Sequence, residues 1–211
     1  MLRNHALRLL SLPDESGGEV PSRLYFSRLP TLETPSLILR PLRRSDAKDI
    51  YAWSQDPEVA RYVLWSPHTS LRDSRAYLRY MRSLYRAGLP SSWGIVLRET
   101  GRVIGTIGFM GYSPENRCAE VGYSLSRSCW NRGLMTEALQ AVLRSAFTAL
   151  NLNRVEAQRD VRNPASGRVM EKCGMVPEGT LRERIWNKGE FIDVVLYAIL
   201  RSNWMESVHR A

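Results

Sequence analysis

The chain has 211 residues, of which 44% are hydrophobic and 24% are charged, a balance typical of a soluble globular protein with a sizeable core. No apolar run reaches the ~20 residues of a membrane-spanning helix, and the N-terminal apolar stretch is too brief for a secretory signal, so we expect a cytoplasmic protein without a membrane partner. The net charge of +9, with arginine at 27 of the 30 positively charged positions, favours anionic partners, although arginines spread along the chain also fit a solvated basic surface.

The first thirty residues differ in character from the rest of the chain. Residues 13–21 are polar and contain two adjacent glycines, so we expect residues 1–30 to form a flexible N-terminal extension. The folded domain is then expected over residues 31–205, followed by a short C-terminal tail at 206–211.

Apolar periodicity predicts strands and helices in alternation from residue 36 onward. Alternate apolar residues predict a strand over 36–43, and the pattern that follows predicts a helix over 45–53. A capping-box spacing opens a second helix at Ser70, and this helix is expected to end at Gly88. Three strands of a meander are expected next, at 93–98, 103–110 and 118–125.

The second half of the chain continues the alternation. Helical periodicity covers 133–150, a strand is expected over 154–161, and Asn163 caps a helix that ends at Cys173. A final strand pair is expected at 175–185 and 191–200. The order β-α-α-β-β-β-α-β-α-β-β predicts a mixed α/β fold built on one sheet.

The cysteines argue against a structural metal site. Cys118, Cys129 and Cys173 are odd in number, and their spacing matches neither a zinc site nor a disulfide framework. We expect reduced thiols and no bound metal.

The junction between the strand at 118–125 and the helix at 133–150 has the features of an anion site. A helix N-terminus presents free N–H groups and the positive end of its dipole. Gly133 allows a diphosphate to approach the backbone closely, and Arg132 adds a full positive charge. An ordinary glycine-containing loop before an amphipathic helix is the alternative.

Three segments in the correct order support the anion site. Ser124-Leu125 through Trp130–Ala138 resembles the acetyl-CoA-binding segment of the GNAT N-acetyltransferase superfamily, most of all the branch of the ribosomal-protein N-terminal acetyltransferases RimJ and RimL. The segments Arg162–Ser166 with Glu171–Met175, and Gly189–Tyr197, are also similar to this branch. The resemblance covers roughly residues 32–204. It implies the GNAT acyl-CoA N-acyltransferase fold, an α+β mixed sheet flanked by helices, and acetyl-CoA as co-substrate.

The resemblance also implies which residues hold the co-substrate: Ser124, Leu125, Asn131, Arg132, Gly133, Leu134, Met135, Thr136, Asn163 and Ser166. Two positions depart from the usual Gln/Arg-x-x-Gly-x-Gly/Ala pattern, since Trp130 and Met135 occupy the first and last places. We expect binding to survive, because most donors are backbone N–H groups. Asn163 would bond the pantetheine arm, or it would only cap its helix.

The proton donor of many superfamily members is missing here. A tyrosine seven residues after the equivalent of Asn163 protonates the leaving thiolate in those proteins, whereas this chain has Met170. We expect Ser166 to replace it, with a helix-cap or solvent-facing serine as the alternative. A strand bulge near Ser124 and Leu125 would expose a backbone N–H that polarises the thioester carbonyl.

Glu120 is the expected general base, because its strand should run beside the thioester. An ion-pair partner for an arginine is the alternative role. Glu183 and Asp193, on the last strand pair, are rivals that could instead anchor a cationic acceptor. The aromatic segment with Trp65 and His68, together with Trp186 as an opposite wall, is the expected acceptor pocket. These aromatic residues could equally serve packing.

The expected reaction is direct transfer of an acetyl group to a primary amine. A protein N-terminal α-amine is favoured, since a pKa near ~8 leaves it partly neutral, whereas a lysine near ~10.4 needs more help. A small amine (amino acid, polyamine or antibiotic) and a non-catalytic CoA-binding module are the alternatives. We do not expect a nucleic-acid partner, except indirectly through a ribosomal substrate. A homodimer could form.

Overall fold

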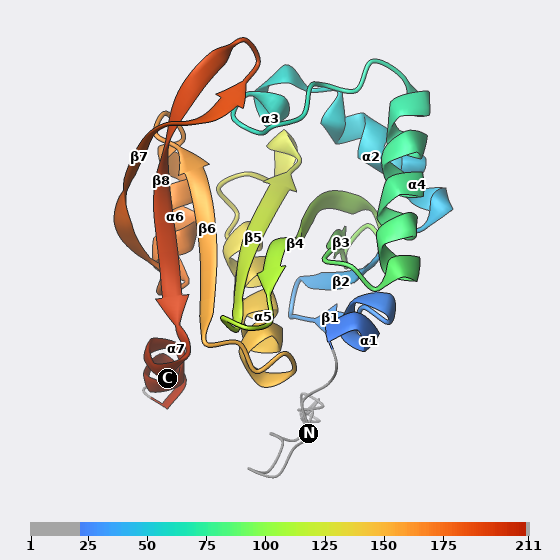
Figure 1. The fold of residues 1–211 in the computed structure, drawn as a ribbon. Helices are drawn as coiled ribbons and strands as arrows, with labels where there is room; N and C mark the ends of the chain where they lie inside the picture. The colour runs from blue at the N-terminus through green and yellow to red at the C-terminus, as the bar shows by residue number, and fades with distance from the viewer. Residues whose placement is uncertain (1–21, 210–211) are drawn as a thin grey trace, which may run out of the picture.

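One mixed sheet of eight strands organises the chain, in the order β1-β2-β3-β4-β5-β6-β8-β7 (Figure 1). The computed structural model describes residues 22–209. All neighbouring strands are antiparallel except β5 and β6, which are parallel. The strands are β1 Leu32–Glu33, β2 Leu37–Pro41, β3 Ser92–Leu97, β4 Val103–Ser113, β5 Cys118–Leu125, β6 Arg154–Asp160, β7 Val176–Asn187 and β8 Glu190–Leu200. The single mixed sheet flanked by helices confirms the predicted fold class.

Helices cover both faces of the sheet and form two hydrophobic clusters. One cluster packs α1, α5 and α6 against one face, and the other packs α2 and α4 against β2, β3 and β4 on the opposite face. The helices are α1 Ser22–Ser27, α2 Ala47–Ser54, α3 Pro57–Ala60, α4 Leu71–Ala87, α5 Leu134–Thr148, α6 Pro164–Lys172 and α7 Arg201–His209, with 3-10 turns η1 Arg44–Asp46 and η2 Arg127–Cys129. None of the described helices is long and apolar enough to span a membrane.

The domain begins earlier than the sequence predicted. Tyr25 and Phe26 of α1 are 5% and 1% exposed and belong to the main core, and the Tyr25 hydroxyl lies 2.6 Å from Ser145 Oγ of α5. The expected boundary at residue 30 is therefore wrong, since at least residues 22–30 belong to the domain. Two aromatic residues in a six-residue helix give no periodic signal. The rest of the expected extension, 1–21, lies outside the described residues.

The C-terminal boundary of the domain also lies later than the sequence predicted. Helix α7 runs through the expected limit at residue 205 and continues to His209. The Trp204 ring packs on Phe147 of α5, with ring centroids 5.2 Å apart. Residues 206–209 are thus helical, while 210–211 lie outside the described part.

Strands β5 and β6 separate soon after they begin, and this opening positions the site. They pair over only three residues each, Cys118–Glu120 with 154–156. Beyond that point β5 stays with β4 through Leu125, while β6 stays with β8 through Asp160. The two strands therefore diverge toward their carboxyl ends, as Figure 1 shows.

The expected bulge lies on a different strand. Ser124 and Leu125 pair regularly with Thr106 and Gly105, so the prediction of a bulge in β5 is wrong. The irregularity lies in β4, between Phe109 and Gly111. Sequence alternation did not reveal this bulge, because β4 is buried on both faces from Val103 to Phe109 and has no period-two pattern whose phase an extra residue could shift.

Candidate active site between diverging strands

The N-terminus of α5 presents unsatisfied donors at the start of the helix. Gly133 is the N-cap residue, with φ 74°, and the first helical bond runs from the Glu137 N–H to the Gly133 carbonyl at 3.0 Å. The N–H groups of Leu134, Met135 and Thr136 have no acceptor among residues 22–209. Three free N–H groups at the positive end of a helix form an anion site.

Gly133 is needed for its backbone angle rather than for lack of space. A Cβ added there would meet nothing within 4 Å, but its positive φ strains any L side chain. Asn131, two residues earlier, also has a positive φ of 58°. The loop therefore turns twice through the left-handed region before the helix begins, and this turn exposes the helix N-terminus.

The two departures from the usual motif have structural explanations. The Trp130 indole Nε1 donates to the Leu125 carbonyl at 2.8 Å, so the ring closes the loop onto the end of β5. Met135 is 6% exposed and packs in the core, away from the free N–H groups. Arg132 is half-exposed and only loosely paired with Glu99, at 3.8 Å. Neither departure removes a donor from the anion site.

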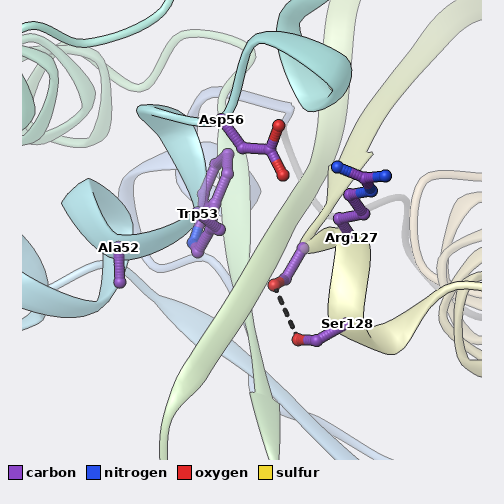
Figure 2. A pocket seen from close by; sticks show the side chains of 6 residues that line it. Ala52, Trp53, Asp56, Arg127 and Ser128 are labelled. Atoms are coloured by element: carbon purple, nitrogen blue, oxygen red, sulfur yellow. Dashed lines mark hydrogen bonds between the residues drawn. The ribbon is translucent and has the colours of Figure 1, made fainter.

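Two open hollows flank this loop. The larger, about 460 Å³, joins the α2–α3 segment to the β5–α5 connection, as Figure 2 shows, and is lined by Ala52, Trp53, Asp56, Ser126, Arg127 and Ser128. Within it the Ser126 and Ser128 hydroxyls are 3.1 Å apart. The second, about 340 Å³, is lined by Pro35, Ser36, Leu97, Arg98, Glu99, Arg132 and Leu134. The second hollow includes Arg132 and Leu134 and so borders the anion site, and neither hollow is lined by the catalytic candidates.

Ser166 is joined to a residue that sequence reasoning missed. Its Oγ lies 2.9 Å from the Tyr123 hydroxyl, which also donates to the Ser166 carbonyl at 3.1 Å. Burial raises the pKa of Tyr123, and the bond to Ser166 partly offsets this effect. Met170, the position of the absent tyrosine, is 1% exposed and lies in the core. The signal for Tyr123 was its strand position, on the same face of β5 as the buried Val121.

Asn163 can serve both of its expected roles. Its Oδ1 accepts the Ser166 N–H at 3.3 Å and so caps α6. Its amide Nδ2 has no hydrogen-bond acceptor among the described residues. Because the cap uses only the oxygen, the NH2 group stays free to donate to a ligand.

Glu120 lies on the opposite face of β5 from Tyr123, because side chains alternate along a strand and Tyr123 is three positions further on. Burial raises its pKa above the ordinary carboxyl value, and the charge of Glu156 adds to this effect. A hydrogen bond from Gln158 and the charge of Arg184 act in the opposite direction. Glu120 is therefore a half-buried carboxylate with raised basicity, at the point where β5 and β6 diverge.

Backbone donors also face the opening. The Ser126 N–H donates to the Ile104 carbonyl at 2.7 Å, toward β4. Backbone groups alternate in direction along a strand, so Ser124 also faces β4, whereas the N–H groups of Tyr123 and Leu125 point toward the gap beside β6. The opening thus has oxyanion donors without a bulge in β5.

The predicted acceptor residues Trp65 and His68 lie in the helical layer. The Trp65 ring packs at 6.1 Å from Trp53 and 5.8 Å from His68. His68 Nδ1 is within hydrogen-bond distance of Ser54 Oγ, at 2.7 Å, and of Ser74 Oγ, at 2.9 Å. Burial lowers the pKa of His68. These contacts satisfy the ring locally, and their role toward an acceptor stays a prediction.

The other acceptor candidates lie on the β7–β8 hairpin. Trp186 and Phe191 are each 61% exposed and pack edge to face at 4.9 Å. A bulge between Leu181 and Ile185 gives Glu183 a φ of 49°, and its N–H donates to Asp193 Oδ1 at 2.7 Å. The structure thus brings Glu183 and Asp193 together, but one carboxylate oxygen of Asp193 holds the bulge. The same bulge carries Arg184, whose charge acts on Glu120 and which the sequence did not reveal.

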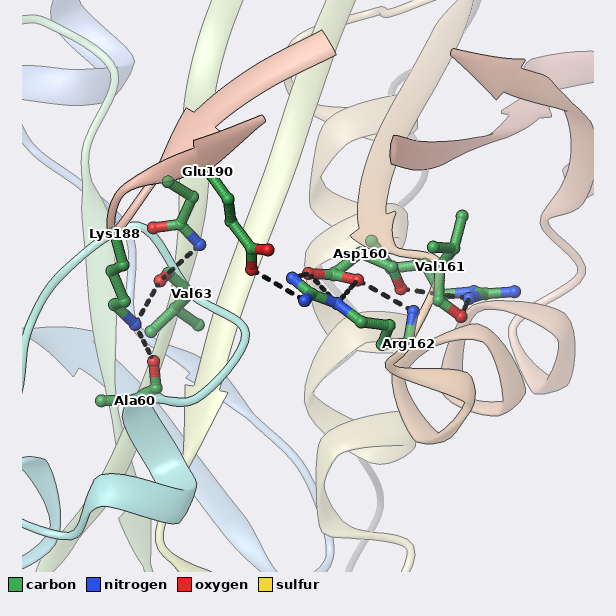
Figure 3. Close-up of polar contacts among 9 residues, drawn as sticks. Ala60, Val63, Asp160, Val161, Arg162, Lys188 and Glu190 are labelled. Atoms are coloured by element: carbon green, nitrogen blue, oxygen red, sulfur yellow. Dashed lines mark hydrogen bonds and ion pairs between the residues drawn. The ribbon is translucent and has the colours of Figure 1, made fainter. Parts of the chain in front are cut away.

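The tip of the hairpin is tied down on two sides (Figure 3). Lys188 Nζ donates to the carbonyls of Ala60 and Val63, the latter at 3.0 Å. On the other side, Arg162 bridges Asp160 at 2.7 Å and Glu190 at 2.8 Å. The hairpin is therefore held as one wall of the opening between β5 and β6.

Comparison with known proteins identifies the family. Residues 36–176 match the model of the acetyltransferase (GNAT) domain. The chain belongs to the GNAT acetyltransferase family. As a member, it is an acetyl-CoA-dependent N-acetyltransferase.

Individual GNAT proteins resemble the chain over most of its length. The N-acetyltransferase p20 of Bacillus licheniformis is 35% identical over 82% of this chain and 98% of its own. The ribosomal-protein-serine acetyltransferase of Escherichia coli is 34% identical over 61% of this chain and 71% of its own. A solved structure of the ribosomal-protein acetyltransferase RimL with coenzyme A has the same fold, with a TM-score of 0.73 at 22% identity, covering 81% of this chain and 98% of that one.

The donor set of the GNAT site fits acetyl-CoA. Free N–H groups at α5 suit a diphosphate, and the free Asn163 amide suits a pantetheine carbonyl. Within residues 22–209 no three His, Cys, Asp or Glu side chains are grouped as metal ligands.

Proposed function

We propose that this GNAT enzyme transfers the acetyl group of acetyl-CoA to a protein N-terminal α-amine. The observation that carries the proposal is the exposed aromatic pair of Trp186 and Phe191 on the β7–β8 hairpin, where we expect the acceptor to bind. An extended peptide can lie along such a wall, whereas a small amine needs an enclosing pocket. The relative from Escherichia coli that is named for ribosomal-protein serine acetylation supports the same class of acceptor.

The co-substrate is proposed to lie across the opening from α5 to α6. The N–H groups of Leu134, Met135 and Thr136, with Arg132, would hold the pyrophosphate. Asn163 would donate its free NH2 to the pantetheine arm. When bound, acetyl-CoA supplies a thioester that is already activated for attack, so positioning provides much of the rate.

Acid and base are proposed to act from opposite faces of β5. Glu120 would accept the proton of the incoming amine on the face that carries Arg184. The N–H groups of Tyr123 and Leu125 would donate to the carbonyl oxygen as negative charge develops there. On the other face, Ser166 would donate its hydroxyl proton to the departing sulfur and regain a proton from solvent, while the Tyr123 hydroxyl, 2.9 Å away, would hold Ser166 in position.

Turnover of acetyl-CoA, followed by thiol release, tests the choice of acceptor. The panel contains N-terminal peptides, the same peptides with a blocked α-amine, polyamines and free amino acids. We expect release with the unblocked peptides and none with the blocked ones. Turnover with polyamines or amino acids alone would instead assign a small-molecule acceptor.

A further inference from the structure

Five arginines form a stripe along helix α4. Arg72, Arg75, Arg79, Arg82 and Arg86 recur at spacings of three and four residues. With 3.6 residues per turn, they fall within a sector of about 80° and along about 21 Å of the helix axis. Four of the five are exposed and Arg82 is half-buried. We call this surface the arginine stripe.

The charge of the arginine stripe is not neutralised within the described chain. None of its five side chains has an ion pair or hydrogen bond to residues 22–209, whereas seven other arginines do form ion pairs, namely Arg40, Arg61, Arg98, Arg102, Arg132, Arg154 and Arg162. The one acidic residue of α4, Asp73, accepts the N–H groups of Thr69 and Ser70 and caps the helix. The stripe is therefore a concentrated positive surface.

The fold does not need this stripe. Helix α4 is held by a separate, buried face, where Leu78 and Met81 are 2% and 5% exposed and belong to the cluster with α2. Five like charges on one helix face repel one another, so the stripe costs stability in isolation. A polyanionic partner would remove this repulsion.

We propose that the arginine stripe binds the phosphate backbone of double-stranded RNA. Guanidinium groups in a row match a row of phosphates, because each guanidinium offers two parallel N–H donors. The stripe follows the helix axis in one narrow row, as a row of backbone phosphates would require, so we expect the contacts to be mainly with the backbone. The choice of RNA also accords with the proposed acceptor, a ribosomal-protein type of N-terminus, and to that extent rests on the proposed function.

The shape of α4 favours RNA over DNA and over protein. The inner side of α4 packs against α2, and the wide, shallow minor groove of an RNA duplex suits the single exposed side that carries the stripe. The large apolar neighbour on the exposed side is Tyr80, at 59% exposure, and a protein interface would need a larger apolar centre. An acidic protein and a DNA duplex are the competing partners to test.

The location of the stripe leaves the reaction undisturbed. Figure 1 places α4 on one flank of the molecule and the β7–β8 hairpin on the other. A duplex bound along α4 therefore leaves the opening between β5 and β6 accessible. Binding at the stripe would hold the enzyme near RNA while the acceptor enters from elsewhere.

Fluorescence anisotropy of a labelled RNA duplex, titrated with the full chain, tests the proposal. Arg75→Gln/Arg79→Gln keeps helix propensity and removes two stripe charges. Arg117→Gln/Arg144→Gln removes two exposed arginines elsewhere and serves as the matched control. We expect the stripe variant to weaken binding roughly ten-fold and to reduce the slope of log K against log salt by about two, with the control near wild type.

Competition identifies the partner. We expect unlabelled RNA duplex to displace the label more effectively than a DNA duplex of the same sequence or polyglutamate. Equal loss in both variants, no measurable RNA binding, or stronger competition by DNA or polyglutamate would overturn the proposal. Thiol release with the acceptor peptides should be unchanged in both variants, so failure of RNA binding and failure of the proposed reaction are separately visible.

Discussion

At the scale of single residues, the proposed mechanism places its base and its acid on opposite faces of one strand. Glu120 and Tyr123 both belong to β5, and their side chains point in opposite directions. The strand position of Glu120 and the resemblance at Ser166 predict them as base and acid, and both roles stay predictions. The sequence placed Tyr123 on the same strand face as Val121 but could not reveal its contact with Ser166, which depends on where α6 lies. Nor could it reveal Arg184, which acts on Glu120 from a bulge in β7.

The pair of Ser166 and Tyr123 leads to a graded loss of activity. Ser166→Ala removes the proposed donor and should lower kcat roughly 10²-fold, the usual range for an acid catalyst. Tyr123→Phe keeps the ring but loses the hydroxyl that supports Ser166, so it should lower kcat about ten-fold. The KM for acetyl-CoA should change little in either variant. Steady-state kinetics by thiol release checks this, and full activity in both would exclude the pair from catalysis.

The raised pKa of Glu120 predicts the acidic limb of the pH–rate profile. The carboxyl must be ionised to accept a proton, so kcat/KM should rise with pH through its pKa. Arg184→Gln removes a charge that favours ionisation, so the limb should move to higher pH. Arg182→Gln, an exposed neighbour on β7, is the control. A shift to lower pH, or no limb in wild type, would contradict the assignment.

Ionisation of Glu120 should lower the stability of the fold, although it raises kcat/KM. A carboxyl whose folded-state pKa is raised stabilises the fold below its unfolded-state pKa, and that contribution is lost as pH rises through the folded-state value. Ionised Glu120 therefore costs stability at neutral pH. Glu120→Gln should raise Tm at neutral pH and lower kcat, with the Tm difference from wild type vanishing in acid. Thermal unfolding at several pH values measures this, and a lower Tm at neutral pH would count against it.

At the scale of elements, the anion site depends on how the chain enters α5. Gly133→Ala should raise the KM for acetyl-CoA and cost about 1 kcal/mol of stability, because alanine disfavours its φ of 74°. Gly101 has a similar φ of 68° in the β3–β4 turn, with nothing near its Cβ. Gly101→Ala should cost similar stability and leave the KM unchanged. Equal KM values in the two variants would remove Gly133 from the binding site.

The tip of the β7–β8 hairpin is an element held by side chains. Lys188→Met removes the donor to the Ala60 and Val63 carbonyls, so the hairpin should open more often. Hydrogen exchange at residues 187–191 should become faster, and kcat/KM for the peptide should fall. Lys48→Met, at an exposed position on α2, is the control. Unchanged exchange in Lys188→Met would show that other contacts hold the tip.

Elements with a strong apolar period could be predicted from the sequence. Features that depend on contacts with distant segments could not. The long helices α4 and α5 follow from apolar spacing, and α5 buries nine residues, among them Leu139, Val142, Leu143, Ala146 and Phe147. Helix α1 was missed because six residues give no period. The bulge in β4 and the sheet order β6-β8-β7 depend on contacts between distant segments.

At the scale of the whole molecule, the net charge of +9 does not show where on the surface the positive charge lies. The arginines form no consecutive run in the sequence, so the sequence alone indicates a dispersed charge. Helical spacing instead gathers five of them on one face of α4. The molecule therefore has an electropositive flank at α4, the opening between β5 and β6 at its centre, and the β7–β8 hairpin on the other flank (Figure 1).

The most direct test of the central claim is to locate the transferred acetyl group. The full chain is incubated with acetyl-CoA and a peptide that carries both a free α-amine and an internal lysine, and the product is fragmented by mass spectrometry. The proposed function is transfer of the acetyl group to an N-terminal α-amine, with Glu120 as base and Ser166 as acid. It predicts a single acetyl group on the α-amine of the peptide. Acetyl on the lysine side chain, or no acetylated peptide when acetyl-CoA is consumed with a small amine, would contradict the account.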